Sequence, residues 1–240
     1  MCRMFGLVAR QPVAARTLLR EAPRSLRTLA REHRDGWGIA LRTATDWVIH
    51  RGTESADDSP RFAEIAAEAS GKVVIAHVRQ KTVGDTALTN THPFQRDVFV
   101  FAHNGSITAI PAVAARASAR RLAEIEGDTD SERLFAFVLT YIDEVGDVER
   151  GVIAAVEALH ALGTIGSTNF LLSCGQRLYA HRLGRSLFTL ARHGADELRR
   201  TASVVVASER LTDEAWHELA EGSLVVVEDA GAGPWLRALR

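Results

Sequence analysis

Apolar and polar positions change between strand-like and helix-like periods along the whole chain. Short apolar runs predict strands over residues 4–9, 37–42, 46–51, 73–78, 98–101, 168–174, 177–182, 186–191, 202–207 and 223–228. Apolar positions at helical spacing predict helices over residues 13–31, 60–69, 110–126, 130–145, 148–162 and 212–221. Residues 80–97 are polar and predict a loop. Several strands are joined by tight turns, so the pattern predicts an α+β fold of two mainly antiparallel sheets covered by helices.

Composition narrows the class of protein further. The chain has 240 residues, of which 46% are hydrophobic and 25% charged, as in ordinary globular domains. We found no linker and no repeat, which favours one domain over residues 1–240. No apolar run is long enough to cross a bilayer, so no membrane partner is expected. The formal net charge of −1 argues against a nucleic-acid partner. Two cysteines cannot build a disulfide framework, and a cytoplasmic location is expected.

Cys2 is the residue that carries most information about chemistry. A cysteine that begins a strand is ordinarily a small buried hydrophobe. Removal of an initiator Met before a small residue would instead leave Cys2 with a free α-amine. Such an amine has a pKa of about 7.7–8.0 and is partly unprotonated near neutrality. Cys2 alone could then supply a nucleophile and a base, whereas Cys174 lies in an apolar run and is expected in the core.

An acyl-transfer nucleophile needs donors for a developing oxyanion, and Asn104-Gly105 is the candidate pair. Asn-Gly by itself is a common hairpin turn. Here a helical segment follows instead of an alternating partner strand, which weakens the hairpin interpretation. The Asn104 amide and the Gly105 N–H, at a strand end, would face the oxyanion.

Two further charged residues fit a zwitterionic ligand. Arg79 ends a predicted strand and could bind a carboxylate in a bidentate manner, although most arginines are solvated surface groups. Thr129 and Glu132 have capping-box spacing ahead of a predicted helix, which is a sufficient structural explanation for that segment. Asp130 could in addition bind an ammonium group.

Metal and nucleotide chemistry have little support in the sequence. His77, His92 and His103 match no ligand spacing, and structural roles are preferred for them. The chain contains no phosphate-binding glycine loop and no GxSxG nucleophile elbow. No cofactor and no metal are expected.

Taken together, six short motifs resemble those of the class II glutamine amidotransferases, in the Ntn-hydrolase superfamily. They are Met-Cys-Arg at 1–3, Asp35-Gly36-Trp37-Gly38, His77-Val78-Arg79, Asn90-Thr91-His92-Pro93-Phe94, His103-Asn104-Gly105-Ser106-Ile107 and Asp128-Thr129-Asp130-Ser131-Glu132. The resemblance covers residues 1–145. The segment Ala207-Ser208-Glu209-Arg210-Leu211-Thr212 resembles the stand-alone branch, which has no fused synthase domain.

The resemblance implies a four-layer αββα sandwich and a role for each matched residue. Cys2 would be the nucleophile, and Asn104 with Gly105 the oxyanion pair. Arg79, supported by Thr82, would bind the α-carboxylate of glutamine, and Asp130 its α-ammonium group. The reaction would pass through a γ-glutamyl thioester and release ammonia or an amine. Residues 79–83 lack the tryptophan of the fused enzymes, so their loop-closure mechanism is not transferred.

The expected substrate is glutamine or another γ-glutamyl compound, and an ammonia-accepting synthase subunit is left open as a partner. Two other functions also remain open. A catalytically silent glutamine-sensing or partner-binding module would bind without Cys2. A cysteine-dependent acylase for other amides would work without Arg79.

Overall fold

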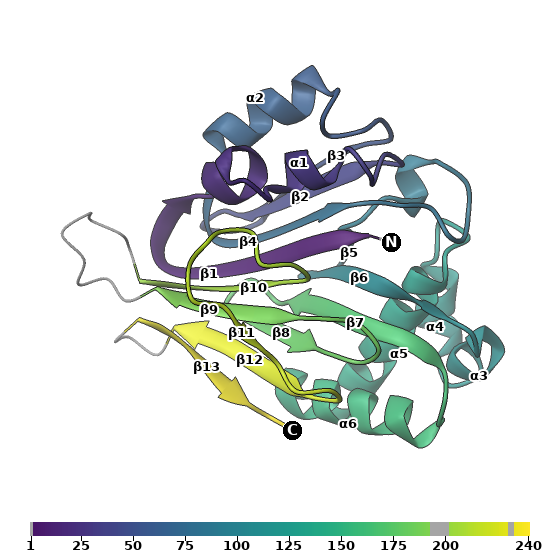
Figure 1. The fold of residues 1–240 in the computed structure, drawn as a ribbon. Coiled ribbons are helices and arrows are strands. Elements are labelled where there is room, and N and C mark those ends of the chain that lie inside the picture. The colour runs from purple at the N-terminus through teal and green to yellow at the C-terminus, as the bar shows by residue number, and fades with distance from the viewer. Residues whose placement is uncertain (1, 193–201, 230–232) are drawn as a thin grey trace.

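The computed structural model describes residues 2–192, 202–229 and 233–240, whose strands form two sheets (Figure 1). The first sheet has the order β11 (His217–Glu218), β9 (Phe188–Arg192), β10 (Ser203–Ala207), β1 (Arg3–Ala14), β4 (Ser70–Val78), β2 (Trp37–Arg42) and β3 (Trp47–Gly52). The second has the order β13 (Pro234–Ala238), β12 (Leu224–Asp229), β8 (Arg177–His181), β7 (Gly166–Ser173), β6 (Phe99–Ile107) and β5 (Phe94–Arg96). The described strand pairs are antiparallel, as the sequence predicts.

Helices cover the outer face of each sheet, which gives four layers (Figure 1). The first sheet carries the π-helical turn η1 (Thr17–Glu21), α1 (Leu26–Leu29) and α2 (Pro60–Glu68). The second carries α3 (Ile110–Ala114), α4 (Ala119–Ala123), α5 (Asp130–Val145) and α6 (Val148–Ala161). A short 3₁₀ turn, η2 (Leu88–Asn90), lies in the loop between β4 and β5. The predicted α+β sandwich of two antiparallel sheets is therefore confirmed.

The two faces of β1 show how the layers are packed. Phe5 and Leu7 point toward the helices, whereas Met4 and Val8 point toward the second sheet, and all four are buried. Successive side chains of a strand point to opposite faces, so a strand buried on both faces is apolar throughout. At Gly6 a Cβ atom would lie 2.6 Å from Leu178 Cδ2, so glycine lets the sheets approach closely here.

Three predicted helices differ from the structure. The helix expected over 13–31 is instead the end of β1, then η1 and α1, because Pro23 lacks an N–H and keeps Ala22 extended, with ψ of 151°. The helix expected over 110–126 is divided into α3 and α4, with Ser118 capping the second. Residues 212–221 form turns and β11 instead of a helix. There Trp216 donates to Thr212, whose hydroxyl bonds Glu214, and such side-chain bonds compete with a helix.

The strand expected over 98–101 is longer than predicted. It continues to Ile107 as β6, so Asn104 and Gly105 lie inside a strand and not at its end. They pair with Asn169 and Thr168 of β7, which excludes the hairpin turn. The short strand β5 lies inside the predicted loop 80–97, and β13 lies beyond the last predicted strand.

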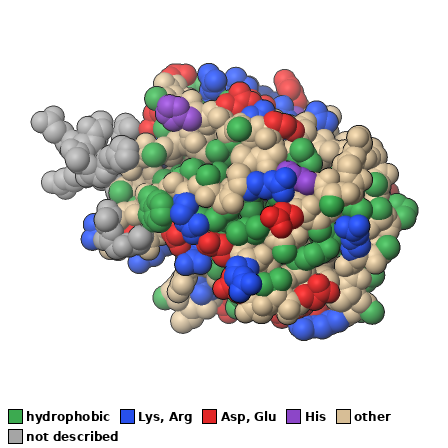
Figure 2. Space-filling view, turned by 90° about the horizontal axis from the view of Figure 1, so that it is seen from below, with side chains coloured by type: hydrophobic (Ala, Val, Ile, Leu, Met, Phe, Trp, Pro, Cys, Tyr) green, Lys and Arg blue, Asp and Glu red, His purple; other side chains and the backbone are tan. Residues whose placement is uncertain are grey.

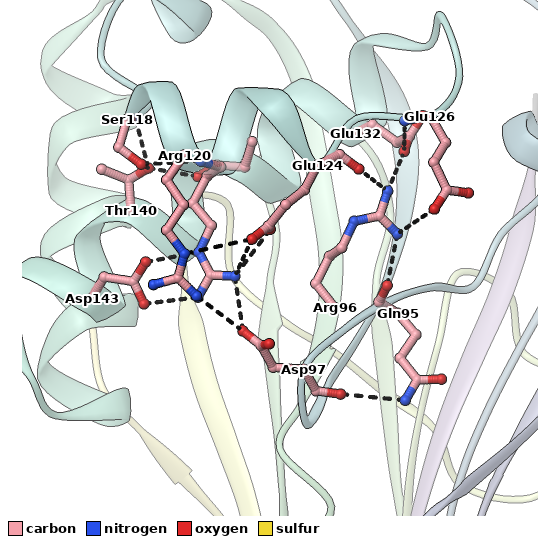
Figure 3. Close-up of polar contacts among 12 residues, drawn as sticks. Gln95, Arg96, Asp97, Ser118, Arg120, Glu124, Glu126, Glu132, Thr140 and Asp143 are labelled. Carbon is pink, nitrogen blue, oxygen red and sulfur yellow. Dashed lines mark hydrogen bonds and ion pairs between the residues drawn. The ribbon is translucent and has the colours of Figure 1, made fainter.

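A buried arginine, Arg121, fixes α4 to α5 and to the turn between β5 and β6. Its carboxylate partners Asp97, Glu124 and Asp143 are labelled in Figure 3. Arg121 has 2% of its side chain exposed and contacts three carboxylates. It bonds Asp143 with Nε at 2.7 Å and Nη2 at 2.8 Å, and its Nη1 lies 2.9 Å from Asp97 and 3.0 Å from Glu124. These carboxylates compensate the charge that burial would otherwise disfavour.

The surface is mixed in charge. On the face drawn in Figure 2, acidic and basic side chains lie interspersed among apolar ones. This arrangement agrees with the formal net charge of −1. Across the described ranges, no helix combines the length and apolar character that a bilayer crossing requires.

Candidate active site

Cys2 lies at the start of β1, in the middle of the first sheet. Arg3 pairs with Val78 at the end of β4, which places Cys2 beside the residues that follow β4. The Cys2 Sγ lies 3.4 Å from the backbone nitrogen of Gln80 and 3.5 Å from its carbonyl oxygen. Burial raises the pKa of the Cys2 thiol, while the Gln80 N–H and the charge of Arg79 oppose that rise. The thiol is therefore next to groups that stabilise its thiolate.

Arg79 is buried, with its guanidinium held by the loop that follows it. It donates to the carbonyls of Val83 at 2.9 Å and of Asp85 at 3.0 Å. Carbonyl oxygens satisfy N–H donors without neutralising the charge. No carboxylate in the described ranges forms an ion pair with Arg79, so its positive charge is available to a ligand anion.

Asn90 connects the loop around Arg79 to the loop ahead of α5. Its Nδ2 donates to the carbonyl of Asp85 at 2.9 Å, and its Oδ1 accepts from the backbone N–H of Asp128 at 3.0 Å. The contact is close, because a Cβ atom on Gly84 would lie 2.3 Å from Asp128 Oδ1. The arginine expected to hold the carboxylate and the aspartate expected to hold the ammonium are thus built on two joined loops.

Asn104 and Gly105 lie on β6, where only one edge of the strand is paired along its second half. The Thr108 N–H donates to the Ile165 carbonyl, just before β7, whereas the Ile107 N–H points to the other edge and donates to Asp130 at 2.7 Å. N–H groups alternate between edges along a strand, so the Gly105 N–H shares the edge of Ile107. A side chain at Gly105 would meet the Ser167 oxygen at 2.0 Å.

The Asn104 side chain lies on the opposite face of β6 from Phe101 and His103, and this face is turned toward the first sheet. It is 3% exposed, and its Oδ1 has no hydrogen-bond partner in the described part of the chain. A buried amide with an unused oxygen is costly unless a ligand or water pairs with it. Asn104 also lines a cavity together with Arg3, the residue that follows Cys2.

Asp130 is the first residue of α5 and is buried. Its Oδ2 accepts from Ile107, and its Oδ1 lies 3.5 Å from the Ser131 hydroxyl. The Thr129 hydroxyl accepts from the Glu132 N–H at 3.3 Å, which is one half of the predicted capping box; the reciprocal bond to the Thr129 N–H is replaced by bonds to other groups. The Glu132 carboxylate accepts from the Gly127 N–H at 2.7 Å and pairs with Arg96 at 2.9 Å. The Glu132 carboxylate therefore holds the loop that leads into the first turn of α5 (Figure 3).

Thr82 is exposed, and its hydroxyl lies 3.4 Å from that of Ser106 on β6. This contact joins the loop after β4 to the strand that carries Asn104 and Gly105. The structure thus brings the matched residues Cys2, Arg79, Thr82, Asn104, Gly105 and Asp130 to one end of the two sheets.

Three contacts beside Cys2 were not predicted from the sequence. His33 Nδ1 lies 3.1 Å from the side-chain oxygen of Gln80, whose backbone contacts the thiol. Burial and the charge of Arg3 lower the pKa of His33 to about 4, so its ring is neutral near pH 7. On the other side of β1, the Ser208 hydroxyl accepts from the Met4 N–H at 3.0 Å, and Glu209 pairs with Arg3 at 2.8 Å.

The three central histidines lie where β4 of the first sheet meets β6 of the second. His77 Nε2 lies 3.2 Å from the His103 carbonyl, and His92 stacks on His77 with centroids 4.3 Å apart. His103 bonds Ser131 at 2.8 Å and the Ser167 carbonyl at 3.1 Å. Within residues 2–192, 202–229 and 233–240, no group of three or more His, Cys, Asp or Glu is placed to hold a metal ion.

Comparison with known proteins gives the family. The family model of the class II glutamine amidotransferases matches residues 1–199. The chain is 30% identical over 191 residues to a Haemophilus influenzae protein named "Putative glutamine amidotransferase", covering 75% of this chain and 63% of that protein. The chain belongs to the class II glutamine amidotransferases. It spans less than two thirds of the length of the curated relatives with which it aligns first.

Solved structures show the same fold. A class II domain protein (SPO2029) from Silicibacter pomeroyi has a TM-score of 0.67 at 20% identity, with 99% of each chain covered. The glutamine phosphoribosylpyrophosphate amidotransferase of B. subtilis has a TM-score of 0.70 at 18% identity, and all of this chain covers 49% of that one. The expected Ntn-hydrolase type of αββα sandwich is confirmed.

Proposed function

We propose that this protein hydrolyses γ-glutamyl amides, glutamine among them, with Cys2 as the nucleophile. The proposal is carried by one observation. The Cys2 thiol contacts the residue that follows Arg79, whose charge no carboxylate in the described ranges compensates. Strand β6 of the other sheet carries the buried Asn104 amide and the strand-edge N–H of Gly105, two residues before Ile107, which binds the buried Asp130. Membership of the class II glutamine amidotransferases supports it. We also propose that residues 1–240 act as one amidotransferase domain.

The proposed reaction divides amide hydrolysis into two steps. The Cys2 thiolate attacks the γ-carbonyl carbon, and the oxyanion is held by the Asn104 amide and the Gly105 N–H. The C–N bond breaks, and the amine leaves with a proton, which gives a γ-glutamyl thioester. Water then releases glutamate and regenerates the thiol. The base is the α-amine that removal of Met1 would expose on Cys2, acting through a water; Met1 lies outside the described residues.

Arg79 and Asp130 define the substrate head group in this proposal. One cation and one carboxylate on joined loops suit the α-carboxylate and α-ammonium of a free glutamyl group. Thr82 supports the loop of Arg79 through Ser106. The released ammonia or amine could pass to a synthase subunit, which would be the protein partner of this chain, in the cytoplasm.

The test is alkylation of Cys2 by a diazo-ketone analogue of glutamine, followed by intact mass measurement and peptide mapping. We expect a protein lighter by one Met and heavier by one adduct on Cys2, together with glutamate release from glutamine. Cys2→Ser is the matched control, and it should gain no adduct and release no glutamate. Loss of Met1 with neither adduct nor glutamate release would overturn the hydrolase proposal and favour a silent glutamine-binding module.

A further inference from the structure

A polar cavity opens directly beside the proposed oxyanion residue. It has a volume of about 290 Å³ and is lined by Arg3, Asn104, Arg185, Ser186, Ser208 and Glu209. A water molecule takes up roughly 30 Å³ of liquid. Ammonia is no larger, so the cavity is far bigger than the leaving group of glutamine needs.

The cavity lies on the opposite side of Cys2 from the proposed head-group residues. β1 runs between β4 and β10 in the first sheet. Arg79 follows β4, whereas Ser208 and Glu209 follow β10, so they flank the start of β1 on its two sides. A substrate with its head at Arg79 and its γ-carbonyl at Cys2 would therefore extend its remaining group into the cavity.

The charges that line the cavity leave one cation uncompensated. Arg3 pairs with Glu209 at 2.8 Å, and Glu209 also accepts from the exposed Arg24 at 2.8 Å. Arg185 has no ion pair in the described part of the chain. Its Nε is buried without an acceptor there. A buried guanidinium donor without an acceptor is unfavourable, and a carboxylate would satisfy it with a charge-assisted bond.

The turn that carries Arg185 is held against β7, the strand that pairs with β6. Asn169, which pairs with Asn104 across the sheet, is fully buried. Its Nδ2 donates to the carbonyls of Arg185 at 3.0 Å and Ser186 at 3.1 Å, and its Oδ1 accepts from the Leu183 N–H at 2.8 Å. Binding residues placed by a rigid turn lose little entropy when a ligand arrives. The cavity wall is thus fixed relative to the oxyanion site.

On the basis of the function proposed above, we infer that this cavity binds the leaving amine of the substrate and that this amine carries a carboxylate, as an amino acid or short peptide does. Arg185 binds the carboxylate. The substrate is then a γ-glutamyl amino acid or γ-glutamyl peptide. One water is consumed, the γ-glutamyl C–N bond breaks, and glutamate and the free amino acid or peptide are released.

The test compares γ-glutamylglycine with γ-glutamylglycinamide, which has nearly the same size but lacks the terminal charge. Binding is measured by calorimetry on the Cys2→Ala protein, which cannot turn either compound over. We expect the carboxylate compound to bind about tenfold more tightly or better, as one charge-assisted hydrogen bond gives. Arg185→Gln should reduce this ratio to about one, whereas Arg24→Gln, which contacts the same Glu209 from outside, should keep it.

Equal affinities for the two compounds, or a ratio that survives in Arg185→Gln, would overturn the inference. The inference would also be overturned if neither compound bound. Hydrolysis of glutamine and of γ-glutamylglycine by the protein with Cys2 intact is measured in parallel. If either compound is hydrolysed while the carboxylate preference is absent, the cavity assignment fails and the proposed function stands. If the carboxylate compound binds preferentially but neither compound is hydrolysed, the proposed function fails.

Discussion

Asn104 combines burial with an unused amide oxygen, which is unusual for a residue with a purely structural role. The backbone of Asn104 pairs with β7, yet its side-chain Oδ1 has no hydrogen-bond partner in the described part of the chain. A polar group of this kind is explained by a ligand that completes its bonds. Because Oδ1 accepts hydrogen bonds, the partner that completes it would be a donor such as a ligand N–H or water. The Nδ2 of the same amide is the group that would donate to the oxyanion in the proposed reaction.

Replacing Asn104 with Ala should lower kcat by roughly 10²–10³, the cost of losing one oxyanion donor. KM should change little, because the donor acts mainly in the transition state. The measurement is steady-state glutamate release, with thermal unfolding as the control for folding. An unchanged kcat in a folded variant would remove Asn104 from the proposed reaction.

The residues of the site divide into those that sequence could indicate and those that it could not. Cys2, Arg79, Asn104 and Asp130 lie in short motifs, so a resemblance names them before their contacts are known. His33 and Gln80 are 47 positions apart in the sequence, and no motif or spacing around either residue indicates that they are in contact. Such a partner is set by how β4 and the turn before β2 meet in space.

The loops between β4 and α5 form one unit through Asn90. Both polar atoms of its amide group are used: one bonds the Asp85 carbonyl in its own loop, and the other bonds the Asp128 N–H in the loop ahead of α5. The segment that holds Arg79 therefore depends on the segment that leads to Asp130. A change at Asn90 should affect binding of the substrate head more than the chemical step.

For Asn90→Ala we expect KM for glutamine to rise about tenfold or more while kcat falls less. The free energy of unfolding should also drop by about 1–3 kcal/mol, because the partner groups lose a buried bond. Kinetics together with urea unfolding would measure both. An increase in KM no larger than that of Gln95→Ala, an amide substitution on β5, would refute a role for Asn90 in joining the loops.

Arg121 joins α4, α5 and the turn between β5 and β6 through carboxylates. Arg121→Met keeps the length of the side chain but leaves Asp143, Asp97 and Glu124 without their cation. We expect a loss of about 3–5 kcal/mol in the free energy of unfolding. Urea unfolding would measure it, and Arg120→Met, at a largely exposed neighbour in the same helix, should cost far less. Equal losses in the two variants would contradict this assignment.

Elements whose pattern is decided by the core were predicted well, and those decided by local polar contacts were not. β4, α5 and α6 have apolar faces that must be covered, and their positions agree with the predictions, whereas β1 was predicted in its buried first half only. Residues 212–221 have helical spacing, but their polar side chains bond one another and His217 pairs with β9. Periodicity does not report such contacts.

Several buried histidines make the stability of the whole molecule depend on pH. Burial lowers the pKa of His33 and His181 to about 4 and that of His77 to about 3, from the ordinary value of 6.5. The folded state therefore resists protonation while the unfolded chain takes up protons. The stability is fully present above about pH 6.5 and is lost as the pH falls toward the folded-state values.

The free energy of unfolding should thus decrease between about pH 6.5 and pH 4, by about 1.4 kcal/mol per histidine for each pKa unit of difference at most. Urea unfolding across this range would measure the slope. In His33→Gln, which keeps a polar partner for Gln80, the slope should be smaller by the contribution of one histidine. A slope identical to that of the parent protein would show that His33 does not contribute.

The fastening of Cys2 has a consequence for the order of synthesis. The strand that follows the thiol is bonded on one side by Ser208, which lies 204 positions beyond its partner Met4. Ser208 is therefore synthesised long after Cys2. Until the segment with β10 has been made and has paired with β1, the Cys2 thiol lies at the edge of an unfinished sheet, and the proposed site is not yet assembled.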